Sequence, residues 1–305
     1  MLRERSLFRG DGVEDIREGL WIFGKCWRRG YAISTENKGG VIEINEHLIH
    51  SKEYGITWVR CPGIGLLCLR RSSRESSSHI NTDYFEEAAN WLSHHPKVLP
   101  HSIGIHAICY GLWIALLMES LNMKAVKTVV AIFPKISVYV KPFTYKGNIS
   151  EVIPFDYSKR IPTEEGYIWR DGDYSKVGEY NAAHAQHSAI TPVEYISCPV
   201  LLVYETDDLF TNPEFAVKMV HDGLNRRGRE NLCSVLCYSG AGHLIEPPYT
   251  PFCCASYLKH GVRILGDSHF VWGGEMKSHA RAQEDAWPKI LSFLRRNLQN
   301  IKCNL

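Results

Sequence analysis

The stretch between residues 102 and 118 constrains the fold more than any other part of this sequence. Residues 102–108 have the composition of a buried strand, and residues 112–118 are apolar on every side of a helix. Only Cys109, Tyr110 and Gly111 separate the two segments. A helix that is apolar all round has to be buried. The sequence therefore predicts a strand, a tight turn and a buried helix.

From about residue 41 onward, apolar runs typical of strands alternate with patterns typical of helices. This rhythm predicts an α/β fold with a mostly parallel sheet and crossover helices. Pro288 fits the last helix only in its first turn, so that helix should begin near residue 285. The expected strands are residues 40–44, 64–69, 102–108, 126–133, 200–204 and 232–238, with a loop at 70–78; the expected helices are residues 83–92, 112–118, 213–227 and about 285–298.

Residues 134–197 carry many aromatic and polar residues with weak periodicity. Irregular chain of this length inside an α/β frame often caps a site, so we expect a cap segment there. Its aromatic side chains would either pack the lid or line a pocket for a bulky substrate group. They are Phe143, Tyr145, Phe155, Tyr157, Tyr167 and Trp169.

Composition excludes several function classes. The net charge of +2 gives no electrostatic footprint for nucleic acid, and 45% hydrophobic with 22% charged residues is typical of a folded globular protein. The ten cysteines show no zinc-type pair and are too sparse for a disulfide scaffold, so we expect free thiols and no metal or cofactor. Residues 103–118 fall short of the ~18 apolar residues of a membrane span, and residues 1–12 lack a signal-peptide core. A cytoplasmic protein without a membrane span is expected.

The turn between the central strand and helix resembles a nucleophile elbow. The pattern is G-x-S-x-G when serine is the nucleophile, and here residues 107–111 place Cys109 at its centre. Small flanking residues suit the strained turn, and Ala107 in place of glycine is a mild departure. Taken alone, Cys109 would more often be a buried structural thiol.

Candidate partners for Cys109 follow in the order that an α/β-hydrolase requires, which is nucleophile, acid, histidine. Asp207 and Asp208 come just beyond the strand at 200–204, and His243 follows the strand at 232–238. His243 would take the proton of Cys109, and an aspartate would fix the tautomer of the imidazole. The alternatives are ordinary turn chemistry for the two aspartates and a surface loop for the histidine.

Three C-terminal segments of the sequence indicate a family relationship. Residues 238–249, 272–275 and 282–287 resemble the acyl-CoA thioesterase and bile acid-CoA:amino acid N-acyltransferase family. The resemblance covers about residues 80–300 and, more weakly, 40–80. It implies an α/β-hydrolase fold that acts on acyl-CoA thioesters.

The resemblance also implies roles for single residues. The triad falls on Cys109, Asp208 and His243, with Asp208 rather than Asp207 as the acid, and the N–H of Tyr110 is one oxyanion-hole donor. The glycine that the family carries shortly before the acid is Glu205 here. The family places a glycine-rich run for the second donor after the strand at 40–44, whereas residues 45–48 of this chain contain no glycine.

Within this family, serine at the elbow goes with hydrolysis, and cysteine goes with transfer of the acyl group to the amino group of glycine or taurine. A cysteine thioester is open to attack by an amine as well as by water, so both reactions in fatty acid or bile acid metabolism remain expected, through an acyl-cysteine intermediate. The alternative is an inactive relative with a binding or regulatory role. A dienelactone-type cysteine hydrolase fits the His243 and Trp272 segments poorly.

The expected organisation is a remnant of an N-terminal region at residues 1–40, followed by an α/β-hydrolase catalytic domain at 41–305 with a cap at about 134–197. Family members typically carry a β-sandwich before the hydrolase domain. The last three residues, Cys303, Asn304 and Leu305, resemble a peroxisomal tripeptide only loosely. The peroxisome is thus the alternative to the cytoplasm.

Overall fold

A computed structural model describes residues 50–51, 56–61, 63–69, 79–94, 98–108, 111–137, 142–153, 156–170, 188–262 and 266–299. The expected strand at 40–44, the loop at 70–78, the elbow residues Cys109 and Tyr110, and residues 1–48 lie outside these ranges. Among the helices that the structure describes, none combines the length and apolar character needed to cross a bilayer.

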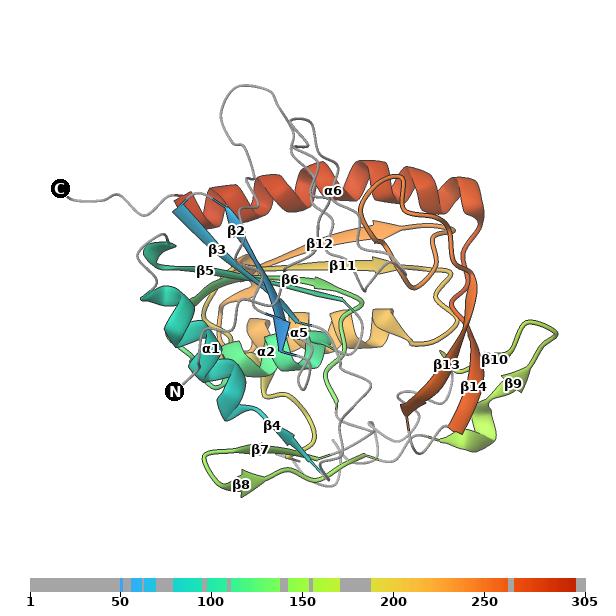
Figure 1. Ribbon diagram of the computed structural model, residues 1–305, viewed down its shortest axis with the longest axis horizontal. Coiled ribbons are helices and arrows are strands. Elements are labelled where there is room, and N and C mark those ends of the chain that lie inside the picture. Colours follow the sequence, from blue (N-terminus) through green and yellow to red (C-terminus); the bar gives the residue numbers. More distant parts are fainter. Residues whose placement is uncertain are drawn as a thin grey trace, which may run out of the picture.

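A seven-stranded sheet forms the centre of the molecule (Figure 1). Its order is β1 (His50–Ser51), β2 (Ile56–Cys61), β3 (Gly63–Leu69), β5 (Val98–Ile108), β6 (Val126–Ile132), β11 (Val200–Glu205) and β12 (Cys233–Tyr238). From β3 to β12 all neighbours are parallel, whereas β1, β2 and β3 pair antiparallel. The expected α/β fold with a mostly parallel sheet is confirmed.

Helices cover both faces of this sheet (Figure 1). The long helix α6 (Met276–Gln299) lies along one face, and α1 (Asp83–Ser93), α2 (Gly111–Ser120) and α5 (Pro213–Asn225) lie on the other. Every residue of α2 is buried, as its all-round apolar sequence predicts. Layers of this kind bury the strands of a parallel sheet on both sides, which explains their near-continuous apolar runs.

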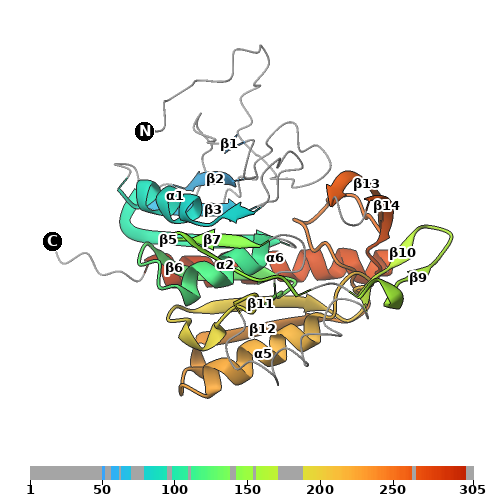
Figure 2. The ribbon, with the colours of Figure 1, turned by 90° about the horizontal axis from the view of Figure 1, so that it is seen from below.

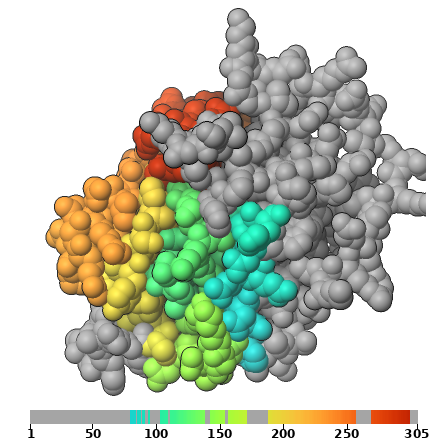
Figure 3. Space-filling model, turned by 90° about the vertical axis from the view of Figure 1, so that its left-hand side faces the viewer, coloured from blue at the N-terminus to red at the C-terminus, as the bar shows by residue number. Residues whose placement is uncertain are grey.

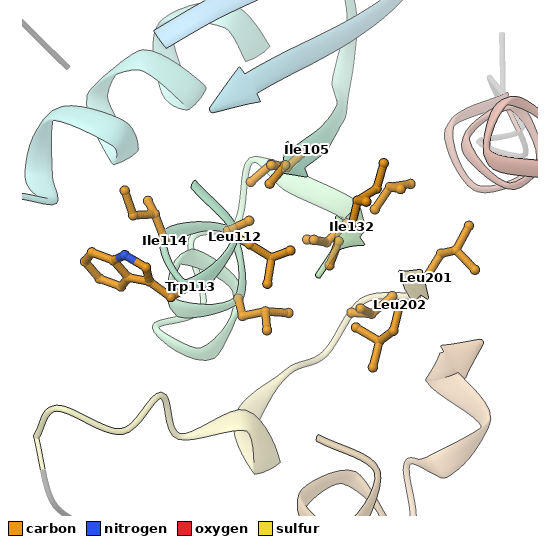
Figure 4. Packing of buried hydrophobic residues seen from close by; sticks show 14 of the residues in the cluster. Ile105, Leu112, Trp113, Ile114, Ile132, Leu201 and Leu202 are labelled. Atoms are coloured by element: carbon orange, nitrogen blue, oxygen red, sulfur yellow. The ribbon is translucent and has the colours of Figure 1, made fainter. Parts of the chain in front are cut away.

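The main core lies on both faces of the sheet, where α2 packs on one side and α6 on the other, and Figure 4 shows part of it. Apolar side chains from the neighbouring strands β5, β6 and β11 pack with those of α2, and Trp113 is fully buried. Members drawn in Figure 4 are Ile105 of β5, Ile132 of β6, Leu201 and Leu202 of β11, and Leu112, Trp113 and Ile114 of α2.

Two smaller sheets and three short 3-10 helices complete the described chain. The sheet β13-β14-β10-β9 lies on the side toward which β11 and β12 run (Figure 2). Its strands are β13 (Ala255–Val262), β14 (Gly266–Val271), β10 (Tyr167–Ile168) and β9 (Ile161–Pro162). The other sheet contains β4 (Ile80–Asn81), β7 (Phe143–Tyr145) and β8 (Asn148–Ile149). The 3-10 helices are η1 (Tyr157–Lys159), η2 (Val193–Tyr195) and η3 (Glu230–Leu232).

The opposite side of the molecule shows the lateral order of the segments (Figure 3). Across this face the colours run from cyan near α1 through green and yellow to the orange of α5 and β12. This sequence of colours follows the order β5, β6, β11 and β12 in the sheet, so consecutive parts of the chain are laid down beside one another.

The expected strands at 64–69, 102–108, 126–133, 200–204 and 232–238 are present within a few residues as β3, β5, β6, β11 and β12. Sequence reasoning missed β2 and the hairpin β13–β14. It also read the cap segment as irregular, whereas β7, β8, β9 and β10 lie there as strands of two or three residues. Strands so short leave almost no periodicity to detect.

The start of the last helix was wrongly expected near residue 285, because Pro288 was assigned to its first turn. α6 begins at Met276, and Pro288 lies in its interior. Proline removes one helix hydrogen bond, the one to the carbonyl of Glu284. Both Glu284 and Pro288 are on the exposed side of the helix, where water can satisfy that carbonyl.

Gly223 in α5 generates a stability prediction. Alanine usually stabilises a helix interior over glycine by about 1 kcal/mol. Here a Cβ on Gly223 would lie 2.6 Å from Cγ2 of Val193. We expect Gly223→Ala to lower the free energy of unfolding by about 1–2 kcal/mol through this overlap, as measured by urea denaturation. In a Val193→Ala background the same change should be neutral or stabilising, and a stabilising effect in the wild-type background would contradict the packing.

Candidate active site

The carboxyl ends of the parallel strands meet at one edge of the sheet. Ile108 of β5 pairs with Ile132 of β6, and Ile132 pairs with Val203 of β11. Glu205 at the end of β11 pairs with Tyr238 at the end of β12. Ligand sites of open α/β sheets lie at this edge, because the loops that follow the strands converge there.

Asp208 and His243 lie on two of these loops, after β11 and β12, and the structure brings them together. Nδ1 of His243 is 2.9 Å from Oδ2 of Asp208, and both side chains are completely buried. A carboxylate accepts hydrogen bonds, so Nδ1 is the ring nitrogen that donates to Asp208, and Nε2 lies on the other side of the ring. Asp207 is exposed, so it is Asp208 that meets the histidine.

The carboxylate of Asp208 is held by three further donors. Its Oδ1 accepts from the backbone N–H groups of Phe210 at 2.7 Å and Thr211 at 3.0 Å. Its Oδ2 also accepts from the hydroxyl of Thr211 at 2.6 Å. A buried charge is tolerable only when such bonds replace water, so this loop is built to keep a carboxylate in one orientation.

Aromatic rings fix the plane of the imidazole. His243 stacks on Phe133 with ring centroids 3.9 Å apart and on Trp272 at 5.0 Å, and Phe210 meets it edge-on at 5.1 Å. Phe133 has a left-handed backbone with φ of 69°, an uncommon conformation for a bulky residue and one that concentrates at functional sites. The strained residue directly follows β6 and supplies one side of this aromatic enclosure.

The loop that carries His243 packs tightly against the segment before α6. A Cβ on Gly242 would lie 2.1 Å from the carbonyl oxygen of Gly273. Gly273 itself has φ of 77° and approaches the backbone of Asp207 so closely that a Cβ would lie 1.9 Å from its carbonyl oxygen. Only glycine allows this approach, which brings the acid loop, the histidine loop and residues 272–274 into contact.

Arg170 links the segment expected as a cap, residues 134–197, to the acid loop, which is the loop of Asp208. Its guanidinium Nη1 donates to the backbone carbonyls of Thr206 at 2.7 Å and Asp208 at 3.1 Å. The backbone N–H groups of Trp169 and Arg170 both donate to the carbonyl of Leu209. Two adjacent residues of this segment thus satisfy the carbonyls of Thr206, Asp208 and Leu209.

The cap aromatics divide between two clusters. Phe143 packs on Trp113 in the main core, with ring centroids 5.5 Å apart. Tyr157 and Tyr167 contact Trp169, which belongs to a second cluster with Phe210, Phe270 and Trp272. The aromatics expected either to pack a lid or to line a pocket therefore do not form one group, and Phe155 lies outside the described residues.

Cys109, Tyr110 and residues 45–48 lie outside the described ranges, so the structure describes two members of the expected triad. In the described part of the chain, no group of three or more His, Cys, Asp or Glu side chains is arranged to hold a metal ion.

Sequence reasoning missed Thr211, Phe133 and Arg170. The first two had a weak signal, because Thr211 follows the acid by three residues and Phe133 ends a predicted strand before proline. Arg170 lies 38 residues before Asp208 in a segment without clear periodicity. Its contact depends on how the cap folds back, which spacing does not reveal.

Glu205 is a buried acid beside this site. Its side chain is fully buried, and neither carboxyl oxygen has a hydrogen-bond partner among the described residues. Burial raises the pKa of Glu205 well above its ordinary value, and the nearby Asp208 and Cys237 act in the same direction. Burial and the charge of Asp208 thus both disfavour the ionised form of Glu205, which would place a second buried negative charge beside Asp208.

Glu205 should make stability fall as the pH rises. Above its ordinary pKa of 4.5 the unfolded chain loses the proton that the folded chain keeps, so protonation linkage favours unfolding. We expect the thermal stability of Glu205→Gln relative to wild type to increase from pH 4 toward neutral pH, by at most about 1.4 kcal/mol per pH unit. Glu205→Gly should show the same trend in calorimetry, and parallel pH curves for wild type and both variants would contradict it.

Comparison with known proteins identifies the family of this chain. A family model described as "BAAT / Acyl-CoA thioester hydrolase C terminal" matches residues 80–300. The human bile acid-CoA:amino acid N-acyltransferase is 35% identical over 85% of this chain and 57% of its own length. The human acyl-coenzyme A thioesterase 6 is 32% identical over 75% and 52%, and the mouse peroxisomal succinyl-coenzyme A thioesterase is 32% identical over 72% and 49%.

The chain thus spans about half the length of these curated relatives. The matched residues include the strand before the elbow, the loop of Asp208 and the loop of His243. Together with the parallel sheet that helices cover on both faces, they give the expected α/β-hydrolase fold. By sequence and architecture, this chain belongs to the family of bile acid-CoA:amino acid N-acyltransferase and acyl-CoA thioester hydrolase C-terminal domains.

Proposed function

We propose that this protein processes acyl-CoA thioesters through an acyl-cysteine intermediate on Cys109. The observation that carries the proposal is the buried hydrogen bond between Asp208 and His243 at the carboxyl edge of the sheet. Cys109 follows β5 directly in the sequence, and Ile108 pairs with Ile132, the residue before the Phe133 that stacks on His243. A candidate nucleophile, an acid and a histidine therefore follow β5, β11 and β12, whose carboxyl ends lie at the same edge of the sheet, in a fold that supports acyl transfer.

In the first half-reaction, Nε2 of His243 accepts the proton of the Cys109 thiol. The resulting thiolate attacks the carbonyl carbon of the acyl-CoA, and the carbonyl oxygen takes the negative charge, toward which the N–H of Tyr110 would donate. The tetrahedral species then expels CoA as a thiolate, which takes the proton from His243. Asp208 keeps the imidazole in the Nδ1–H tautomer and stabilises the imidazolium between these steps.

In the second half-reaction, a water or an amine attacks the Cys109 thioester. His243 takes a proton from the attacking group and returns it to the sulfur of Cys109, which leaves as the thiol. Water gives a carboxylic acid, and the amine of glycine or taurine gives an amide. The aromatic enclosure of Phe133 and Trp272 prevents rotation of the ring, so Nε2 stays on the same side throughout.

The names of two relatives support the two outcomes. One relative is an amino acid N-acyltransferase and another is a succinyl-coenzyme A thioesterase. An acyl-CoA substrate is common to both names. We place the reaction in fatty acid or bile acid metabolism, with glycine or taurine as the candidate acceptor.

Intact-mass spectrometry tests the acyl-cysteine. Wild-type protein incubated with a long-chain acyl-CoA should gain the mass of one acyl group, whereas Cys109→Ala should gain none. Acyl chains of several lengths and a bile acid-CoA should be included, since the preferred acyl group is unknown. Unmodified wild-type protein with every thioester, together with no release of CoA, would sink the proposal in favour of an inactive family member. The lack of glycine in residues 45–48 is the observation that favours that alternative.

The two adjacent aspartates provide a matched test of the acid. Asp208→Asn keeps the shape of the side chain but favours the wrong histidine tautomer, so CoA release should slow by about 100-fold or more. Asp207→Asn removes the same charge from the exposed neighbour and should stay within about twofold of wild type, because Asp207 does not contact His243. Equal losses in both variants would show that general electrostatics, and not the hydrogen bond to His243, supports the reaction.

Hydrolysis and transfer are separated by the product. With glycine or taurine present, an acyltransferase forms an amide, and CoA release without amide identifies a thioesterase.

For location we propose the cytoplasm, with the peroxisome as the alternative that the name of the mouse thioesterase supports. A full-length protein with a fluorescent reporter at its N-terminus should give diffuse fluorescence, and punctate fluorescence that matches a peroxisomal marker would select the alternative.

A further inference from the structure

We propose that His279 of α6 is a positioning residue, which fixes the loop of His243 through the backbone N–H of Gly242. This inference rests on the proposed function, since it concerns how the same histidine is held for the reaction. His279 is not a catalytic residue in this proposal, because it contacts the loop and not the reacting atoms.

Three hydrogen bonds hold the loop of His243 against residues 272–279. Two of them are between backbones, from Glu275 N–H to the carbonyl of Gly240 at 2.8 Å and from His243 N–H to the carbonyl of Trp272 at 2.9 Å. The third comes from a side chain, because Nδ1 of His279 accepts the N–H of Gly242 at 3.2 Å. His279 thus binds the residue directly before His243.

This bond requires a neutral His279. Nδ1 accepts a hydrogen bond only when it carries no proton, so the proton of the neutral ring is on Nε2. The ring is buried, with 3% of its surface exposed, and burial lowers its pKa, although interaction with the backbone of Leu244 acts in the opposite direction. A protonated ring would point an N–H at the N–H of Gly242 and lose the bond.

The bond matters because the N–H of Gly242 is buried and the loop has little freedom to compensate. The close approach of Gly242 to Gly273 leaves no room for the loop to turn toward another acceptor. Without His279, a buried donor would be left unpaired, which costs about 1–3 kcal/mol, or the loop would move. A shift of this backbone would displace the imidazole of His243 from Asp208 and from its place between Phe133 and Trp272.

Two conservative variants separate positioning from general packing. In His279→Asn the side-chain carbonyl oxygen takes the place of Nδ1, so it can still accept from Gly242. In His279→Gln the polar end corresponds to the place of Nε2, and the acceptor for Gly242 is lost. Gln283→Leu is the control, because Gln283 is equally buried one turn further along the same helix. Circular dichroism and thermal unfolding establish that each variant is folded.

The first readout is independent of catalysis. Proton NMR detects the N–H that His243 shares with Asp208 as a low-field resonance, which Asp208→Asn assigns by removing it. We expect this resonance to persist in His279→Asn and Gln283→Leu and to shift or broaden in His279→Gln. An unchanged resonance in His279→Gln, or equal disturbance in both His279 variants, would overturn the proposal.

The second readout is kinetic. With an acyl-CoA that the wild type accepts, kcat for His279→Gln should fall about tenfold or more with KM unchanged, whereas His279→Asn and Gln283→Leu should stay within about threefold of wild type. If the wild type shows no acylation, the proposed function fails, and the NMR comparison still decides the role of His279. If the wild type is active and His279→Gln retains its kcat, the proposed function stands and the inference on His279 is wrong.

Discussion

The hydrogen bond between Asp208 and His243 is the constraint on which the arrangement of this site depends. A fully buried carboxylate must receive donors in place of water. The backbone of Phe210, the backbone and hydroxyl of Thr211 and the ring of His243 supply them. This requirement sets the turn after β11, the distance between two loops and the tautomer of the histidine. The need to supply donors to one buried carboxylate therefore brings together Asp208 and His243, which are 35 positions apart in the chain.

Residues outside these two loops hold Asp208 and His243 in position relative to each other. Arg170 ties the cap segment to the acid loop by donating to backbone carbonyls. Gly273 and His279 join the segment before α6 and the helix itself to the acid and histidine loops. Because α6 also packs on the main sheet, the position of His243 is coupled to the core of the domain. Burial raises the pKa of Glu205 beside this pair, which disfavours a second negative charge in the same region.

The helices and strands predicted from the sequence agree with the structure where local patterns are strong, and they differ where an element depends on contacts with distant parts of the chain. The apolar run of α2 and the strands β5, β6, β11 and β12 leave clear periodicity, so their positions were confirmed. β13 and β14 were missed, and α6 starts nine residues before the expected position, because Pro288 was taken as a boundary. The exposed face around Pro288 tolerates the missing bond, a property of the folded surroundings that a propensity rule does not contain.

The sequence by itself determined the fold class and the order of Cys109, Asp208 and His243, because both depend on periodicity and on spacing along the chain. Spacing left Asp207 and Asp208 open and the family resemblance favoured Asp208; only the tertiary structure shows that the side chain of Asp208 meets His243 while Asp207 is exposed, because burial and direction are properties of a folded loop. It also decided the support from Phe133, Arg170 and His279. These residues come from separate elements that only the packing of helices and cap against the sheet edge brings within contact distance.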